Sequence, residues 1–88
     1  MVECIFIGGM LHGERAWLER ADKLLWRPLN EGQVAAYGLR ESPEGSARVF
    51  YAPIGFSAYQ YQHCLDDYFR RELVASQAKI RRGVRTHP

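Results

Sequence analysis

Residues 56–73 read FSAYQYQHCLDDYFRREL, and their first part carries the signals of a helix start. Ser57 and Gln60 have the spacing of a capping box, in which each side chain accepts a hydrogen bond from the backbone amide of the other residue. Phe56 and Tyr61 occupy the two positions of a hydrophobic staple, which fixes the path of the chain into the helix. These signals predict a helix that begins directly after Ser57.

The same helix has a predictable buried face. Its apolar side chains recur at helical spacing, and they are Tyr61, Leu65, Tyr68, Phe69, Leu73 and Ile80. We expect a helix over about residues 58–82, with Leu65, Phe69 and Leu73 packed against a sheet. A helix of this length, at about 1.5 Å per residue, is longer than a compact body of this size, so its end is expected to project.

Three segments before the helix have the composition of β-strands. Residues 2–7 form an almost continuous apolar run, which is typical of a strand covered on both faces. Residues 34–39 and 47–52 are two further β-prone runs, and Pro43 and Gly45 between them predict a hairpin. The expected fold class is α+β, with a small antiparallel sheet of three to five strands packed against one long C-terminal helix.

Residues 14–27 fit two different structures. Their apolar residues recur at the spacing of an amphipathic helix. However, no helix-capping side chain precedes Glu14, and two strands over residues 15–18 and 24–27 fit the sequence equally well. The choice between a helix and a hairpin stays open on these residues alone.

Several large or sulfur-containing side chains are expected in the core. Trp17 and Trp26 are predicted to be buried, because large aromatic side chains anchor small cores, with an interface as the alternative. Cys64 is predicted to be a buried thiol, in keeping with the usual burial of free cysteines. Cys4 and Cys64 are both expected to be reduced.

Length and composition point to one globular domain. The chain has 88 residues, of which 47% are hydrophobic and 25% charged, far from the composition of a disordered chain. We expect a single domain over residues 1–88, mainly β over 1–56, helical over 57–83, with a basic tail over 84–88. No secretory signal and no apolar run of about 20 residues is present, so a cytoplasmic protein without membrane contact is expected.

The histidines, cysteines and acidic residues show no pattern of an active site. His63 and Cys64 are neighbours on the predicted helix and point about 100° apart, too far to act as base and nucleophile. His12, His63 and His87 lack the spacing of zinc ligands. We therefore expect no enzyme, no metal and no cofactor.

Two further groups are interpreted as structural. Asp66 and Asp67 are each followed four residues later by arginine, Arg70 and Arg71, which is typical of surface ion pairs. The glycines of the turn over residues 8–13 are not followed by the lysine and hydroxyl residues of a phosphate-binding loop.

Two groups of residues remain as candidate binding sites. Tyr59, Gln62 and His63 share the helix face opposite Leu65, and aromatic and amide side chains of this kind are enriched at protein interfaces. The second group is the basic helix end, where four cations without an acidic neighbour are placed to contact phosphates or to complement the helix dipole. These cations are Lys79, Arg81, Arg82 and Arg85.

The first strand leads into the turn Gly8-Gly9-Met10-Leu11-His12-Gly13-Glu14, and Val49-Phe50-Tyr51-Ala52-Pro53 leads into the helix. In these features the chain resembles small accessory proteins encoded by tailed bacteriophages, whose first strand ends in a Gly-Gly-x-x-x-Gly turn before a second strand. The resemblance favours a hairpin over residues 14–27. It also implies a host-cell cytoplasm in which small proteins bind and redirect host machinery.

The function expected from these features is that of a non-enzymatic protein-binding module. It would be a phage-encoded regulator or inhibitor that occupies a site on a host protein or protein complex. The alternative is a nucleic-acid-binding accessory protein that uses the basic helix end, and a homodimer stays open. A nucleic-acid mimic is disfavoured, because the net charge of +2 is not that of a densely acidic surface.

Overall fold

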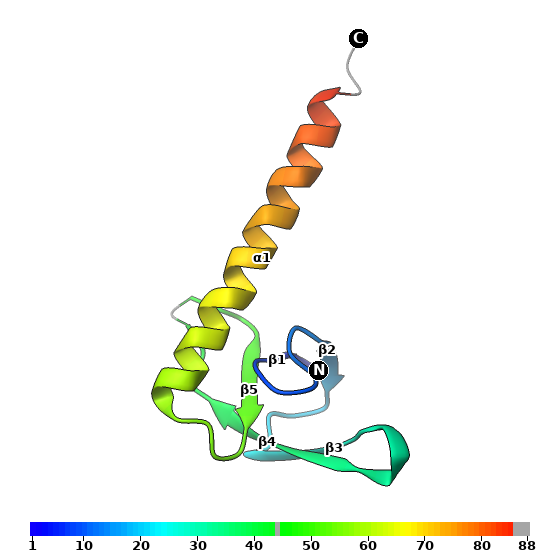
Figure 1. Cartoon of the computed structure of the whole chain (residues 1–88), viewed down its shortest axis with the longest axis vertical. Helices are drawn as coiled ribbons and strands as arrows, with labels where there is room; N and C mark the ends of the chain where they lie inside the picture. The colour runs from blue at the N-terminus through cyan, green and yellow to red at the C-terminus, as the bar shows by residue number, and fades with distance from the viewer. Residues whose placement is uncertain (44, 86–88) are drawn as a thin grey trace.

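Five strands precede one long helix in the computed structural model, which describes residues 1–43 and 45–85, with side chains up to residue 77 (Figure 1). The strands are β1 (Val2–Phe6), β2 (Arg15–Leu18), β3 (Leu24–Pro28), β4 (Val34–Arg40) and β5 (Val49–Pro53). A short 3-10 helix, Asn30–Gly32, joins β3 to β4, and α1 spans Ala58–Arg85. The predicted α+β class, a small sheet with one long C-terminal helix, is confirmed.

The strands form a single sheet in the order β2-β1-β5-β4-β3. The predicted hairpin of β4 with β5 is present, and three of the four strand pairs are antiparallel. The fourth pair is parallel, with Ile5 of β1 opposite Phe50 of β5. β1 is therefore an internal strand, and Cys4 to Ile7 are buried on both faces as expected.

Residues 14–27 form two strands that do not pair with each other, so the expected hairpin over this segment is wrong. β2 pairs with β1 and β3 pairs with β4, which places them at opposite edges of the sheet. β2 lies along β1 and β3 lies along β4, and each of these two neighbouring strands carries buried core side chains. The loop between them is held at the sheet by the Tyr51 hydroxyl, which donates to the Asp22 carbonyl at 2.6 Å.

The core lies on both faces of the sheet. On one face α1 covers the central strands with Tyr61, Leu65 and Tyr68, which contact Ile5, Ile7, Phe50 and Ala52. On the other face Cys4, Phe6, Tyr37 and Tyr51 form a second cluster, which has no helix to cover it. The sheet curls instead, and side chains of its own edge strands and turns close this cluster, among them Leu11, Leu18 and Leu25.

The start of α1 agrees with the capping box predicted for it. The backbone amide of Gln60 donates to the Ser57 hydroxyl at 3.1 Å, and the backbone amide of Ser57 donates to the Gln60 side chain at 2.8 Å. These bonds satisfy two amides that a helix leaves without internal partners. The helix therefore begins where the local sequence specifies.

The far part of α1 projects from the body, as expected from its length (Figure 1). The expected burial of Leu73 is wrong, because its side chain is 60% exposed. Leu65 is buried and Phe69 packs against the same cluster, whereas the buried apolar contacts between α1 and the sheet do not extend to Leu73.

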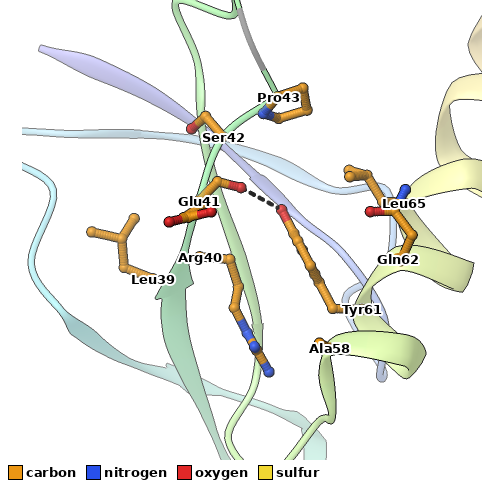
Figure 2. Close-up of a pocket in the computed structure, with 9 residues that line it drawn as sticks. All are labelled: Leu39, Arg40, Glu41, Ser42, Pro43, Ala58, Tyr61, Gln62 and Leu65. Atoms are coloured by element: carbon orange, nitrogen blue, oxygen red, sulfur yellow. Dashed lines mark hydrogen bonds between the residues drawn. The ribbon is translucent and has the colours of Figure 1, made fainter.

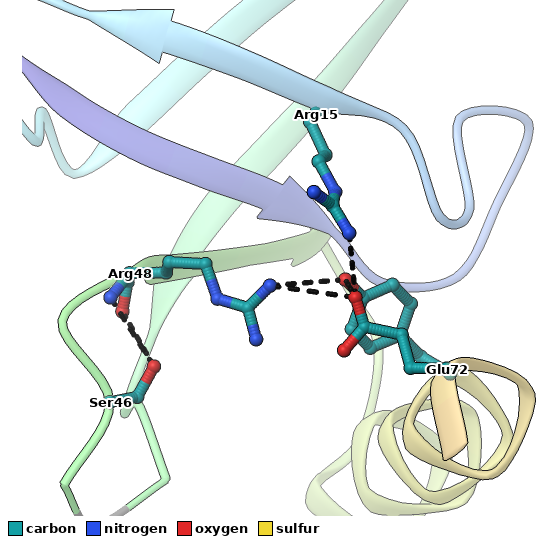
Figure 3. A network of polar contacts seen from close by, with 5 residues as sticks. Arg15, Ser46, Arg48 and Glu72 are labelled. Atoms are coloured by element: carbon teal, nitrogen blue, oxygen red, sulfur yellow. Dashed lines mark hydrogen bonds and ion pairs between the residues drawn. The ribbon is translucent and has the colours of Figure 1, made fainter. Parts of the chain in front are cut away.

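A polar network fastens α1 to the sheet where the apolar contacts end. Figure 3 shows Arg15 of β2 and Arg48 reaching Glu72, at 2.7 Å and 3.6 Å. The Tyr68 hydroxyl also donates to Glu72, at 2.6 Å. The hydrogen bond from Tyr68 and the two arginines hold the pKa of Glu72 below its ordinary value, whereas burial raises the pKa of Tyr68.

A second polar contact joins the turn after β1 to α1. The Gly8 amide donates to Nδ1 of His12 at 2.7 Å, so Nε2 of the neutral ring carries the proton and donates to Asp67 at 3.1 Å. This bond is the main reason that the pKa of Asp67 lies below its ordinary value. Gly8 has no substitute here, since its φ is +85° and a Cβ would lie 2.5 Å from the Phe56 ring.

One of the two expected helical ion pairs is present. Asp67 accepts from Arg71 at 3.1 Å. Asp66 instead accepts from the Gln62 amide at 2.8 Å, and no ion pair with Arg70 is found within the part of α1 whose side chains are described.

Replacement of Leu65 by alanine should lower the free energy of unfolding by about 2–5 kcal/mol, because it leaves a cavity between α1 and the sheet. Leu73→Ala is the matched control on the same helix, and it should change stability by about 0.5 kcal/mol or less, because Leu73 is mostly exposed. Urea denaturation of both variants measures the difference. Equal losses would mean that the helix is not docked through Leu65.

Glu72→Gln should destabilise the protein by about 1 kcal/mol at pH 7, a small value because the carboxylate is partly exposed. A lowered pKa in the folded state gives stability that is complete above the ordinary glutamate pKa of about 4.3 and is lost as the pH falls through the folded value. The difference from wild type should therefore vanish in acid. Glu19→Gln, at an exposed residue with no ion pair among those the structure describes, is the control and should leave the stability at pH 7 close to that of wild type.

Candidate protein-binding surface

The register of β3 with β4 decides which side chains of this hairpin face outward. Leu25 lies opposite Tyr37. Tyr37 is buried in the second core cluster, with Cys4, Phe6 and Tyr51, which we call the inner cluster. Because side chains alternate along a strand, Leu24 and Trp26 point to the other face of the sheet. This is the face that α1 covers further along the sheet, over β1 and β5.

Four large apolar side chains gather on the outer face at this hairpin, three from the hairpin itself and one from the residue after β5, and we call them the outer patch: Leu24, Trp26, Val34 and Ile54. Each is more than half exposed, from 53% for Leu24 to 66% for Trp26. Val34 is one of the β4 residues whose side chains point to the outer face. The Ile54 side chain lies 4.0 Å from the position that a Cβ atom would occupy at Gly38. The outer patch therefore lies on the same face of the sheet as α1, but outside the part of that face that the helix covers.

The expected burial of both tryptophans is wrong. Trp26 belongs to the outer patch, and Trp17 of β2 is 64% exposed on the opposite edge strand. Trp17 lies opposite Glu3, while its neighbours Ala16 and Leu18 take the positions that face the inner cluster. In each edge strand the smaller residues fill the core, and the indole ring is left outside.

A groove of about 590 Å³ separates the first turns of α1 from the end of β4. Figure 2 shows Tyr61 crossing this space, where its hydroxyl donates to the Glu41 carbonyl at 3.1 Å. Arg40 donates to the Phe56 carbonyl, and its guanidinium carbon lies 5.3 Å from the centre of the Tyr61 ring. Burial raises the pKa of Tyr61, so the phenol stays neutral. Tyr61 and Arg40 therefore already have partners within the chain.

The predicted helix face of Tyr59, Gln62 and His63 is solvent-exposed. The Tyr59 ring stacks on the His63 ring, with centroids 6.3 Å apart and an interplanar angle of 13°. Gln62 donates to Asp66 and also lines the groove. The structure thus brings Tyr59 and His63 together, while binding by these three residues stays a prediction.

The four predicted phosphate contacts lie at the end of α1. The helix backbone continues through Arg85, but the side chains of Lys79, Arg81, Arg82 and Arg85 are outside the described residues. Nucleic-acid binding by these residues stays a prediction.

The two thiols differ in their surroundings. Cys4 is completely buried, and this burial raises its pKa. Cys64 packs against the helix-side cluster as predicted, but it is only half-buried. Neither forms a disulfide.

Within the described residues no group of three or more His, Cys, Asp or Glu side chains is placed to hold a metal ion. Both ring nitrogens of His12 are engaged, by Gly8 and Asp67. Over the same part of the chain, no helix has the length and apolarity needed to cross a bilayer.

No family model matches the chain, and searches of curated proteins and of solved structures found no similar protein. The resemblance to accessory proteins of tailed bacteriophages therefore stays a prediction.

Cys64 should react with a thiol reagent much faster than Cys4 in the folded protein, because Cys4 has no solvent exposure and a raised pKa. Native-state alkylation followed by mass spectrometry of proteolytic fragments separates the two sites. After unfolding, both should react at similar rates. Rapid native labelling of Cys4 would contradict its place in the inner cluster.

Proposed function

We propose that this chain is a non-enzymatic protein-binding module that holds a partner against the outer patch and acts by steric occupation. The observation that carries the proposal is the grouping of four large apolar side chains, each more than half exposed, three on one face of the β3–β4 hairpin and Ile54 beside them. Exposed apolar groups gathered in this way are typical of interaction sites on soluble proteins.

Trp26 is the expected anchor of the interaction. Tryptophan is enriched among the interface residues whose removal costs most binding energy, because its large ring is rigid and buries much surface. Opposite Trp26 the neighbouring strand carries Ala36, and opposite Leu24 it carries Gly38. These small residues leave room beside the indole ring for side chains of a partner.

The chemistry of the outer patch favours a protein over a nucleic acid or a small ligand. The outward positions of the paired residues of β3 and β4 are Leu24, Trp26, Pro28, Val34, Ala36 and Gly38, none of them charged. Phosphate backbones require cations, and small molecules require a concave pocket that buries most of their surface. An exposed apolar face with one aromatic anchor fits a folded or extended protein surface.

Trp26→Ala should weaken capture of the partner by roughly 30-fold, the scale of a hot-spot residue. Trp17→Ala is the matched control, because Trp17 is equally exposed but lies on the opposite edge of the sheet. The assay compares wild type and both variants as immobilised baits in a bacterial lysate treated with nuclease, and captured proteins are quantified by mass spectrometry. The resemblance to phage proteins makes a bacterial protein complex the first partner to seek.

Two outcomes would contradict the proposal. If the captured protein disappears after nuclease treatment, the interaction runs through nucleic acid. If Trp17→Ala and Trp26→Ala reduce capture equally, the outer patch is not the binding surface.

A further inference from the structure

β3 is an edge strand, and its hydrogen-bonding pattern shows which backbone groups are free. At one end the Leu39 amide donates to the Lys23 carbonyl at 2.9 Å, and at the other the Leu29 amide donates to the Gln33 carbonyl at 2.7 Å. Hydrogen-bonded and non-bonded positions alternate in an antiparallel ladder. The backbone groups of Leu24, Trp26 and Pro28 therefore point away from β4.

The free edge of β3 is short and well defined. Pro28 has no backbone N–H, so Leu24 and Trp26 offer the two available donors together with their carbonyls. Such an edge accepts a further strand through main-chain hydrogen bonds. These are the same two residues whose side chains belong to the outer patch.

Arg27 gives this edge a charge on its inner side. Its guanidinium lies 5.5 Å from the centre of the Phe6 ring and lines a cavity of about 290 Å³ between the ends of β2 and β3. Glu14 and Arg15 line the same cavity, but Arg15 is bound to Glu72. Among the described residues Arg27 makes no ion pair within 4.0 Å, although it is half-buried.

We propose that β3 accepts an extended segment of a protein partner as an added strand, with an acidic residue placed against Arg27 and apolar residues placed beside Leu24 and Trp26. This inference rests on the proposed function and names the chemistry of the partner. Side chains of the added strand alternate between the two faces, so one acidic and one apolar face satisfy both requirements. Opposite charges and apolar pairs across neighbouring strands are both stabilising.

Charge repulsion disfavours a second copy of this chain paired through its own β3 edge as the occupant. Two copies could pair through their β3 strands in antiparallel orientation. If all free backbone groups of Leu24 and Trp26 are used, Leu24 of one copy lies opposite Trp26 of the other. Each Lys23 then lies opposite the Arg27 of the other copy. Like charges directly opposite each other destabilise a strand pair. A register centred on Trp26 instead sets Leu24 against Pro28, which has no amide to donate.

The opposite edge of the sheet is less suited to this role. Trp17 of β2 is exposed, but it lies beside Glu3 and is followed two residues later by the exposed Glu19. Arg15 of the same strand is engaged by Glu72. Only the β3 edge combines free backbone groups, an apolar outer face and a cation without an acidic partner among the described residues.

Amide hydrogen exchange measured by NMR tests the added strand directly. The probe is a synthetic eight-residue peptide that alternates valine and glutamate, and the control peptide has lysine in place of glutamate. The valine–glutamate peptide should slow exchange of the Leu24 and Trp26 amides, and Arg27→Gln should weaken its binding roughly fivefold. Absence of this protection, or equal binding of the lysine peptide, would overturn the inference.

A proline substitution separates strand addition from binding to the outer patch alone. Leu24→Pro removes a donor that points away from β4, so no hydrogen bond of the sheet is lost, and proline is tolerated at such edge positions. It should weaken peptide binding roughly tenfold, whereas the matched Leu24→Val, which keeps the backbone donor and an apolar side chain, should weaken it much less. If Leu24→Pro does not fold, the exchange of the wild-type amides still decides the question.

The same variants distinguish the two proposals. Loss of the captured partner in Trp26→Ala but not in Leu24→Pro would leave the protein-binding function standing and refute strand addition. Retention in both variants would refute both proposals.

Discussion

β1 and β5 run side by side in the same direction, and this pairing places two sets of core side chains back to back. Ile5 and Phe50 point to the helix, whereas Phe6 and Tyr51 point to the opposite face. Among the described residues there is one α-helix, and it can cover one face only. The second set is therefore buried by curling of the sheet, and the positions of both edge strands follow from this requirement.

The same constraint explains why a small protein exposes so much apolar surface. α1 lies over β1 and β5, and on the far side of β4 the sheet continues without a cover. The β3–β4 hairpin is held from its inner side, where Leu25 packs against the cluster that contains Tyr37. The Tyr37 hydroxyl also donates to the Gly8 carbonyl at 3.1 Å, which ties the hairpin to the first turn. The outer patch is thus presented on a supported surface.

The features that were predictable from the sequence depend on residues close together in the chain. Ser57 and Gln60 define the helix start, and Leu65 follows from the helical period. Contacts between distant residues left no such signal: His12 and Asp67 are 55 positions apart, and neither their spacing nor their chemistry singles out the pair. The strand order likewise depends on which strand pairings bury the core side chains on both faces of the sheet.

The candidate site was missed for a related physical reason. Residues 14–27 have a helical period as well as strand composition, and Trp17 and Trp26 were predicted to be buried only because large aromatic side chains anchor small cores. The alternation of Ala16 and Leu18, with Leu25 in the second strand, was the available signal that the tryptophans face outward. Exposure of Leu24 and Val34 depends in addition on where α1 stops covering the sheet, and no local pattern contains that information.

The exposure of both indole rings also determines what fluorescence spectroscopy can report about this molecule. Indole emission depends on the polarity of its surroundings, and in the folded chain both rings already contact water. Global unfolding should therefore change tryptophan emission little, although it removes the whole core. The four buried tyrosines, Tyr37, Tyr51, Tyr61 and Tyr68, carry the optical signature of the folded state instead. A change in tryptophan emission in the folded protein therefore reports that an indole ring has been covered rather than that the core has unfolded.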